Sequence, residues 1–599
     1  MVGALVAAAA LFALRVGKQP LQPYGSNAAE YIEHAVRLEV AAVAQRADSL
    51  PALLFAADEA VLTHPPGLHL VTLPAHALLG RSAEAIVWTG FGWHLLLALA
   101  LGACAFGLTR RRRAVAAALC AGLLFPAGLA AATRYHYDLP MTALIWSAAG
   151  LLLLARDRFP LRAGAAAGLL LAAATLVKWT ALPLGAIVAL AALWPEDRAR
   201  VGARLRAGLC LSLAWAAPVL AFLHLSLSSF QAGVMAVEGE PAQGDVGPLA
   251  VPLAFAGRIV RSLVDADPGS LLWYPAALVV ALFSPLLVGV SLPLLRAWWR
   301  GGEARALVLI AVLGQCAVLA LGLSVLDERF ALTAAPALLL AAALGAARLP
   351  TGSPWPVLVL AVAALVGAEF HGSTAGPWNR VQRVGMGPVA PALSLRGPWL
   401  GDSFEGRGWS SAATTPSSAP EQRAATWAAI RRCGVEQLGY VDGLSDQGDT
   451  WWLRYEARLH DVDLLVLSHG SLGPRRFWWP DPDTHASVHE YEQWGFSMDA
   501  VGDPGAFGPL NEVELALNLR ALGLRIAALE HFQPTVAISR IPVGTDTPID
   551  ASWRPLERID AGDAEPLALH GRGPLPCPGP PFEAPPSGAA AAQRSRLPR

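Results

Sequence analysis

The sequence has few charged residues. Only 15% of its 599 residues are Asp, Glu, Lys or Arg, whereas a soluble globular chain carries about 25%. Hydrophobic residues make up 54% of the chain and its mean hydropathy is +0.44. This composition indicates a membrane protein. A net charge of −1 and a pI near 6.9 give no basis for nucleic-acid binding.

Cysteine is also scarce. Six scattered cysteines are too few for a disulfide framework or a metal ribbon. Four of them fall inside apolar runs and are interpreted as small core residues. Cys433 and Cys577 lie in the polar C-terminal third, where they would pair only if that part is extracytoplasmic. The spacing leaves this pairing open.

Long apolar runs are abundant, and a spanning helix needs about 20 such residues. The sequence predicts a polytopic α-helical membrane protein with about eleven transmembrane helices. The first run has no positive n-region and no clear cleavage site, so we interpret it as an anchor. The predicted spans are 2–16, 84–109, 114–133, 139–155, 162–177, 180–194, 207–228, 271–295, 306–326, 330–347 and 354–370.

The loops between these runs fix an orientation. Alternate loops together hold 15 arginines, the densest being Arg110 to Arg113, whereas the opposite loops hold nine cations although two of them are long. The positive-inside rule makes the arginine-rich side cytoplasmic. We therefore predict an inner (cytoplasmic) membrane protein, with the loop 17–83 and everything after residue 371 outside. A Gram-negative periplasm fits this arrangement.

The composition changes after the last span. Residues 372–425 contain SSAATTPSSAP and are interpreted as a linker that follows a membrane domain over 1–371. Alternating strand and helix patterns then predict a soluble periplasmic or extracellular α/β domain over 426–572. The tail 573–599 is so rich in Pro, Gly and Ala that we predict it to be disordered.

Several ionisable residues on the external side lie at the membrane edge. Arg134 and Asp138 occur in RYHYDLP, Lys178 lies between two spans, and Asp327 and Arg329 lie between two others. Such groups are costly unless they pair, face a cavity or bind a ligand. Lys178 and Arg329 alone are equally explained as cations that extend to the interface. As a set, they predict a phosphate site with an acid beside it as general base.

The first external loop contributes two further features. GSNAAEYIEHAVRLEV has the apolar spacing of an amphipathic helix that carries Glu30 and Tyr31. After it, consecutive prolines at 65 and 66 keep His64 out of helical geometry. We expect a helix that lies on the membrane surface to follow.

The order of these segments resembles a known family. HPPGLHL follows the first loop, YHYDLPMTALIW opens the second external loop, a lysine turn follows AGLLLAAATLVKWTALPL, and DERFALTAAPALLL comes late. This order is similar to the membrane-embedded GT-C glycosyltransferases, in particular the protein O-mannosyltransferase and aminoarabinose-transferase branch. The resemblance covers residues 1–371.

The resemblance implies a function. Such an enzyme transfers a sugar from a polyprenyl-phosphate donor to a protein, lipid or glycan acceptor, and inverts the anomeric carbon. It implies that Asp138 is catalytic and that Lys178 and Arg329 hold the phosphate. Substrate contacts would come from Tyr31, His64, Arg134, Tyr135, His136, Tyr137 and Asp327. A divalent metal requirement varies in the family, no motif here encodes one, and we expect no other cofactor.

One departure from the family pattern matters. An Asp-Glu pair is usual about four residues before a tyrosine, whereas Asn27 and Ala28 precede Tyr31 here. An amide cannot accept a proton as a carboxylate does, so Glu30 is the predicted replacement, with Asp58 or Glu59 as alternatives. Two other functions stay open: a transporter or flippase of a lipid-linked substrate, and a catalytically degenerate scaffold.

Overall fold

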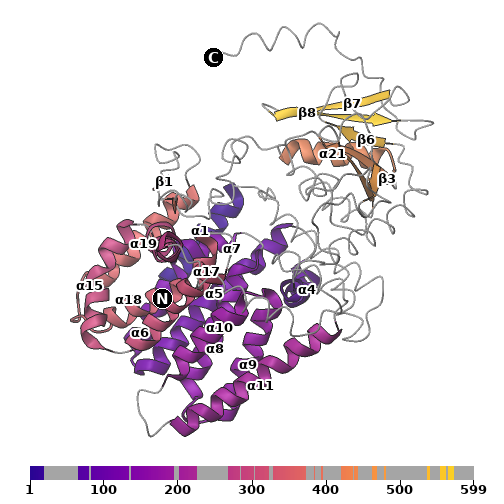
Figure 1. Cartoon of the computed structure of the whole chain (residues 1–599). Helices are drawn as coiled ribbons and strands as arrows, with labels where there is room; N and C mark the ends of the chain where they lie inside the picture. The colour runs from indigo at the N-terminus through magenta and orange to yellow at the C-terminus, as the bar shows by residue number, and fades with distance from the viewer. Residues whose placement is uncertain are drawn as a thin grey trace. The chain divides into compact units, whose positions relative to one another are not determined.

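The structure is a computed structural model of the whole chain (Figure 1). The residues that it describes fall into these ranges: 1–18, 65–79, 83–133, 136–194, 201–225, 268–283, 285–302, 304–322, 328–372, 383–384, 393–394, 420–435, 437–442, 462–468, 478–480, 536–539, 554–561 and 564–571. They divide into two compact units. The first comprises Met1–Ala413 with 511–514, and the second comprises Thr414–Leu510 with Leu515–Arg599.

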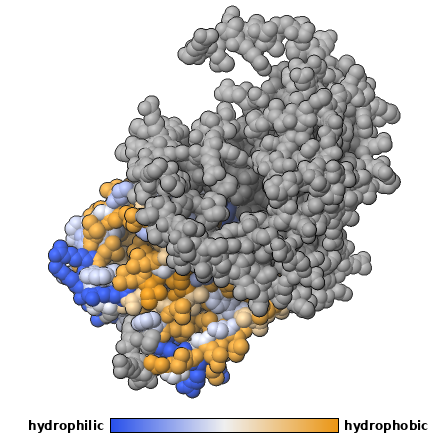
Figure 2. Space-filling view, viewed as in Figure 1, coloured by the Kyte–Doolittle hydropathy of each residue, from blue (hydrophilic) through white to orange (hydrophobic). Residues whose placement is uncertain are grey.

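The first unit is helical. Five of its helices are long and apolar enough to cross a membrane, and a bent pair raises this number to six. The described helices of this unit are α1 (Val2–Lys18), α4 (Gly67–Leu79), α5 (Ala83–Thr109), α6 (Arg112–Leu123), α7 (Pro126–Ala132), α8 (Asp138–Ala155), α9 (Pro160–Val177), α10 (Ala181–Leu193), α11 (Val201–Leu225), α14 (Pro268–Ala277), α15 (Pro285–Gly301), α16 (Arg305–Leu309), α17 (Gln315–Gly322), α18 (Ala335–Ala346) and α19 (Trp355–Gly372). The described part of the chain therefore has the character of a multi-pass membrane protein. On the face seen in Figure 2, the coloured residues are largely hydrophobic, and hydrophilic residues gather at the edges of the coloured area.

Most predicted spans coincide with these helices, but the predicted span 114–133 is broken. It consists of α6 and α7, which meet at an angle of 51°. Pro126 occupies the first turn of α7, and proline has no N–H to continue the hydrogen bonds of α6. The chain therefore turns at Leu124 and Phe125 and starts a new short helix.

Two more predicted spans are interrupted by π-helical turns. The segment 271–295 contains α14, a π turn (η2, Leu278–Leu282) and α15, and the segment 306–326 contains a π turn (η3, Ile310–Gly314) between α16 and α17. The last predicted site segment is a 3-10 turn (η4, Glu328–Thr333) that leads into α18. Such departures from α geometry are invisible to a hydropathy window, because it reads composition and not hydrogen bonding.

The core of this unit lies between α5, α8, α9 and α18. Its largest fully buried side chains include Trp146 on α8 and Phe12 on α1. Small residues allow close helix contacts: a Cβ added at Gly164 or Gly168 of α9 would come within 2.4 Å of a carbonyl oxygen of α11. Close backbone approach at small residues is the usual way in which helices pack in membranes.

In the second unit, the described residues form one helix and a six-stranded sheet in the order β5-β4-β3-β6-β8-β7. Strands β3 (Gln437–Asp442), β4 (Asp463–Ser468) and β6 (Val536–Ser539) are parallel. Strands β5 (Trp478–Pro480), β8 (Ala564–Gly571) and β7 (Arg554–Ala561) extend the sheet antiparallel. A two-residue pair, β1 (Arg383–Val384) and β2 (Leu393–Ser394), belongs to the first unit.

The helix of the second unit, α21 (Pro420–Arg432), begins inside the predicted linker. Its Trp427 and Ile430 pack in one buried cluster with Leu438, Val536 and Leu569 of the sheet. Cys433 follows the helix and is disulfide-bonded, whereas Cys577 lies outside the described residues.

Candidate functional site

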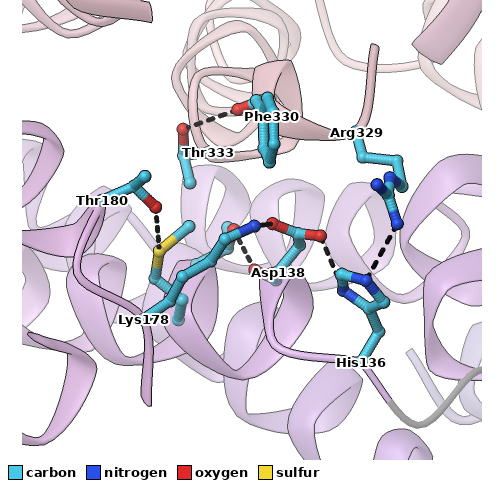
Figure 3. A network of polar contacts seen from close by, with 9 residues as sticks. His136, Asp138, Lys178, Thr180, Arg329, Phe330 and Thr333 are labelled. Atoms are coloured by element: carbon cyan, nitrogen blue, oxygen red, sulfur yellow. Dashed lines mark hydrogen bonds and ion pairs between the residues drawn. The ribbon is translucent and has the colours of Figure 1, made fainter. Parts of the chain in front are cut away.

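Four of the predicted site residues form one chain of polar contacts (Figure 3). Lys178 Nζ lies 2.7 Å from Asp138 Oδ1, and His136 Nδ1 lies 2.7 Å from Asp138 Oδ2. On the far side of the imidazole, Arg329 Nη1 lies 2.9 Å from His136 Nε2. Asp138 is only 3% exposed, whereas the Lys178 side chain is 18% exposed. Two cations are therefore joined through one buried carboxylate and one histidine.

Each residue of this network is placed by the end of an element. Asp138 begins α8, where a carboxylate is favoured by the helix dipole, and its carbonyl accepts from Thr142 Oγ1 at 2.7 Å. Lys178 caps α9 in an extended conformation, φ −156° and ψ 130°. The chain leaves the helix at that point and turns at once into α10, because the N–H of Ala181 donates to the Lys178 carbonyl.

Arg329 is carried by η4, which is tied to α8. The indole N–H of Trp146, a fully buried residue, donates to the carbonyl of Thr333 at 2.8 Å. Because Thr333 ends the 3-10 turn that Glu328 begins, this contact fixes the turn against the helix of Asp138. The two cations thus come from turns 151 positions apart in the sequence and lie at the N-terminal end of α8.

The hydrogen bonds assign the protonation of His136. Arginine only donates, so Nε2 must accept from Arg329, and Nδ1–H must donate to Asp138. Burial lowers the pKa of His136 from 6.5 to about 4, although Asp138 opposes the shift. The histidine is therefore neutral at pH 7. With Lys178 and Arg329 each positive and Asp138 negative, the four residues carry a net charge of one positive unit.

The ring of Phe330 lies near both cations of the network. Lys178 Nζ lies 4.3 Å from the centre of the Phe330 ring, and the guanidinium carbon of Arg329 lies 6.0 Å from it. Figure 3 shows the ring turned toward the network from η4. A cation over an aromatic face is attracted by the ring quadrupole, so Phe330 supports the position of the Lys178 ammonium group.

Helix α4 packs against both segments that carry the network. His69 Nε2 lies 3.0 Å from the hydroxyl of Tyr137, and both side chains are almost completely buried. At the start of α4, a Cβ on Gly67 would lie 2.3 Å from the carbonyl oxygen of Leu176. Only glycine permits this approach, which is two residues from Lys178. Helix α4 therefore contacts both segments that carry the network.

The predicted site residues have different outcomes. Asp138, His136, Lys178 and Arg329 are brought together, while Tyr137 is buried, bonds His69 and lies edge-on to the His136 ring. Six predicted residues lie outside the described residues, or have side chains outside them: Glu30, Tyr31, His64, Arg134, Tyr135 and Asp327. The alternatives Asp58 and Glu59 lie outside them as well.

Sequence reasoning missed three residues that hold the network or its supporting segments in place. His69 stood in the HPPGLHL segment, Phe330 followed Arg329 directly, and Trp146 was read only as part of an apolar run. A histidine in an apolar helix was the one available signal. Among the described residues, no group of three or more His, Cys, Asp or Glu side chains is arranged to hold a metal ion.

Comparison with known proteins gives a likeness to solved structures. No protein family model matches the chain, and no curated protein matches it. Among solved structures, the chain is similar to ArnT from Cupriavidus metallidurans in the apo state. The TM-score is 0.47 and the sequence identity is 14%, over 89% of this chain and 93% of that chain. The likeness concerns the fold alone.

Proposed function

We propose that the chain is an integral membrane glycosyltransferase. It transfers a sugar from a polyprenyl-phosphate donor to an acceptor on the external face of the membrane, with inversion at the anomeric carbon. The observation that supports this most is the network of Lys178, Asp138, His136 and Arg329, because it presents fixed positive charge at the end of several apolar helices. The order of motifs in the sequence supports the same reaction class.

The charge of the network suits the leaving group. A polyprenyl phosphosugar is a phosphodiester with one negative charge, and the released polyprenyl phosphate gains a second as the bond from the anomeric carbon to oxygen breaks. Cations that meet this growing charge stabilise the transition state more than the bound donor. Lys178 has donor N–H groups beyond its contact with Asp138, and Arg329 has donors beyond its contact with His136.

The same geometry assigns Asp138 a role other than general base. Both of its oxygens are engaged, since Oδ1 accepts from Lys178 and Oδ2 lies 2.7 Å from His136 Nδ1, and the side chain is nearly inaccessible. We therefore propose Asp138 as a positioning residue that holds the two flanking groups. The acceptor proton then goes to a carboxylate of the first external loop, for which Glu30 remains our candidate. The acceptor oxygen attacks the anomeric carbon opposite to the departing phosphate.

The test separates binding from turnover. Purified protein in nanodiscs is offered radiolabelled polyprenyl-phosphate sugars, with the matching polyprenols as neutral controls. We expect wild type to bind the phosphates selectively and to consume one of the donors. Lys178→Met and Arg329→Met should lose binding, Glu30→Gln should keep binding and lose turnover, and Arg113→Met serves as control because this arginine bonds Thr351 elsewhere.

Two results would contradict the proposal. Equal binding of polyprenol and polyprenyl phosphate by wild type would show that the network does not bind the phosphate group. Selective binding without consumption of any donor would instead favour a transporter or a degenerate scaffold, and transport of the bound lipid across a proteoliposome would distinguish these two.

A further inference from the structure

One buried histidine has no part in the network described above. His94 lies within α5 and is completely buried. Its Nε2 is 3.0 Å from the carbonyl oxygen of Leu123, which ends α6. An ionisable residue inside a membrane segment is costly and usually has a specific task, so this contact requires an explanation.

The contact lies at the break between α6 and α7. In an unbroken helix the Leu123 carbonyl would accept from the N–H of residue 127, but the chain turns at Phe125, whose own N–H bonds back to Gly122. Helix breaks inside membranes persist where a neighbouring helix satisfies the freed backbone groups. His94 does this here, since a carbonyl only accepts and Nε2 must therefore carry the proton.

A second contact comes from the same face of α5. A Cβ on Gly90, one turn before His94, would lie 2.0 Å from the carbonyl oxygen of Ala132 at the end of α7. At the other end, a Cβ on Gly128 would lie 2.9 Å from His94 Nδ1. Residues four apart share a helix face, so Gly90 and His94 together support both ends of α7.

Helix α7 leads directly into the candidate site. It ends at Ala132, Thr133 caps it, and His136 and Asp138 follow within six residues. The direction in which α7 leaves the break therefore sets where the segment before α8 begins. A shift of about 1 Å in such a segment is enough to cost two orders of magnitude in rate.

We propose that His94 is a positioning residue of the site. By donating to Leu123 it sets the angle between α6 and α7, and with Gly90 it places the segment that carries His136 and Asp138. The inference adds a remote residue to the proposed function, and it depends on that function only for the binding measurement below.

The experiment compares two replacements of His94 in the full-length protein. His94→Gln keeps an N–H donor on a side chain of similar reach, and His94→Leu removes the donor at similar volume. Gly107→Ala is the control, because Gly107 also lies in α5 but its added Cβ would meet Leu153 of α8, away from the break between α6 and α7. Affinity for a short-chain polyprenyl monophosphate and the thermal unfolding midpoint are measured for each.

We expect His94→Leu to weaken phosphate affinity about ten-fold in protein that is still folded, with His94→Gln close to wild type. Gly107→Ala should lower the unfolding midpoint and leave affinity unchanged. Full affinity in folded His94→Leu would overturn the inference, because the residue would then be structural only.

A second measurement covers the case in which wild type binds no phosphate. Thr133 is replaced by cysteine in each background, and its rate of labelling by a thiol reagent is compared with that of the protein lacking this cysteine. We expect a changed rate with His94→Leu and an unchanged rate with His94→Gln. Equal rates in all three backgrounds would refute the role of His94 independently of the proposed function.

Discussion

The pair formed by Asp138 and Lys178 makes a quantitative prediction. Removing one partner of a buried ion pair costs about 3–5 kcal/mol, because the other charge is left unpaired. In Asp138→Leu the Lys178 ammonium group loses its anion, but its side chain is 18% exposed and reaches water in part. We therefore take the lower end of the range, about 3 kcal/mol, for this loss.

The same replacement also removes the acceptor of His136 Nδ1–H. An unsatisfied donor of this kind adds about 1 kcal/mol, so Asp138→Leu is expected to cost about 4 kcal/mol in total. The double variant Asp138→Leu/Lys178→Met removes both charges of the pair, so neither is left without the other. Only the unsatisfied histidine remains, and about 3 kcal/mol should be recovered.

The assay is equilibrium unfolding in mixed detergent micelles for wild type, both single variants and the double variant. An exposed pair supplies the control: Arg432 and Glu557 lie 2.8 Å apart at about half exposure, and their cycle should give a coupling below about 1 kcal/mol. If the double variant of the buried pair is as unstable as the sum of the singles, the two charges are not coupled. The reasoning about the network would then be refuted.

Three further predictions concern neighbouring residues. Burial lowers the pKa of His136 from 6.5 to about 4, so on acidification the unfolded chain binds a proton at this residue before the folded chain does. The contribution of neutral His136 to stability is therefore fully present above pH 6.5 and is lost as the pH falls toward 4. Unfolding free energies of wild type and His136→Gln should diverge across that window, and parallel curves would contradict the assignment. Gly67→Ala should lower both stability and donor binding, because the added Cβ would clash with the Leu176 carbonyl. Gly92→Ala is the control and should be neutral, because its added Cβ would have no atom within 4 Å. Equal thermal unfolding midpoints of the two variants would rule out the contact at Gly67. Tyr137→Phe should cost about 1 kcal/mol by depriving buried His69 of its partner, and an unchanged unfolding curve would show that the two rings merely touch.

The sequence predicted which residues meet but not how they bond. Asp138, Lys178 and Arg329 were expected on one side of one bundle, because alternate loops of a membrane protein share a side. The exact pairing was out of reach, since Lys178 and Asp138 are 40 residues apart and His136 and Arg329 are 193 apart. Hydropathy and charge patterns carry no information about contacts over such separations.

Tyr137 illustrates a second limit. Neighbouring side chains in the turn before α8 point in different directions, so Tyr137 turns inward to His69 while His136 joins the network. Sequence reasoning treated the three residues Tyr135 to Tyr137 as one group. The same limit applies to the break at Pro126: proline signals a break, but its angle depends on His94 and Gly90 from another helix.

The separation of His136 from Arg329 has a consequence for how the protein is made. The ribosome adds about 5–20 residues per second, so the 193 residues between them take about 10–40 s to synthesise. For most of this interval, from the synthesis of Lys178 onward, Asp138 has its lysine but His136 has no arginine. The site is therefore completed only when nearly the whole helical unit has been inserted, and a chain truncated before η4 would carry the acid and the lysine without ever forming the finished network.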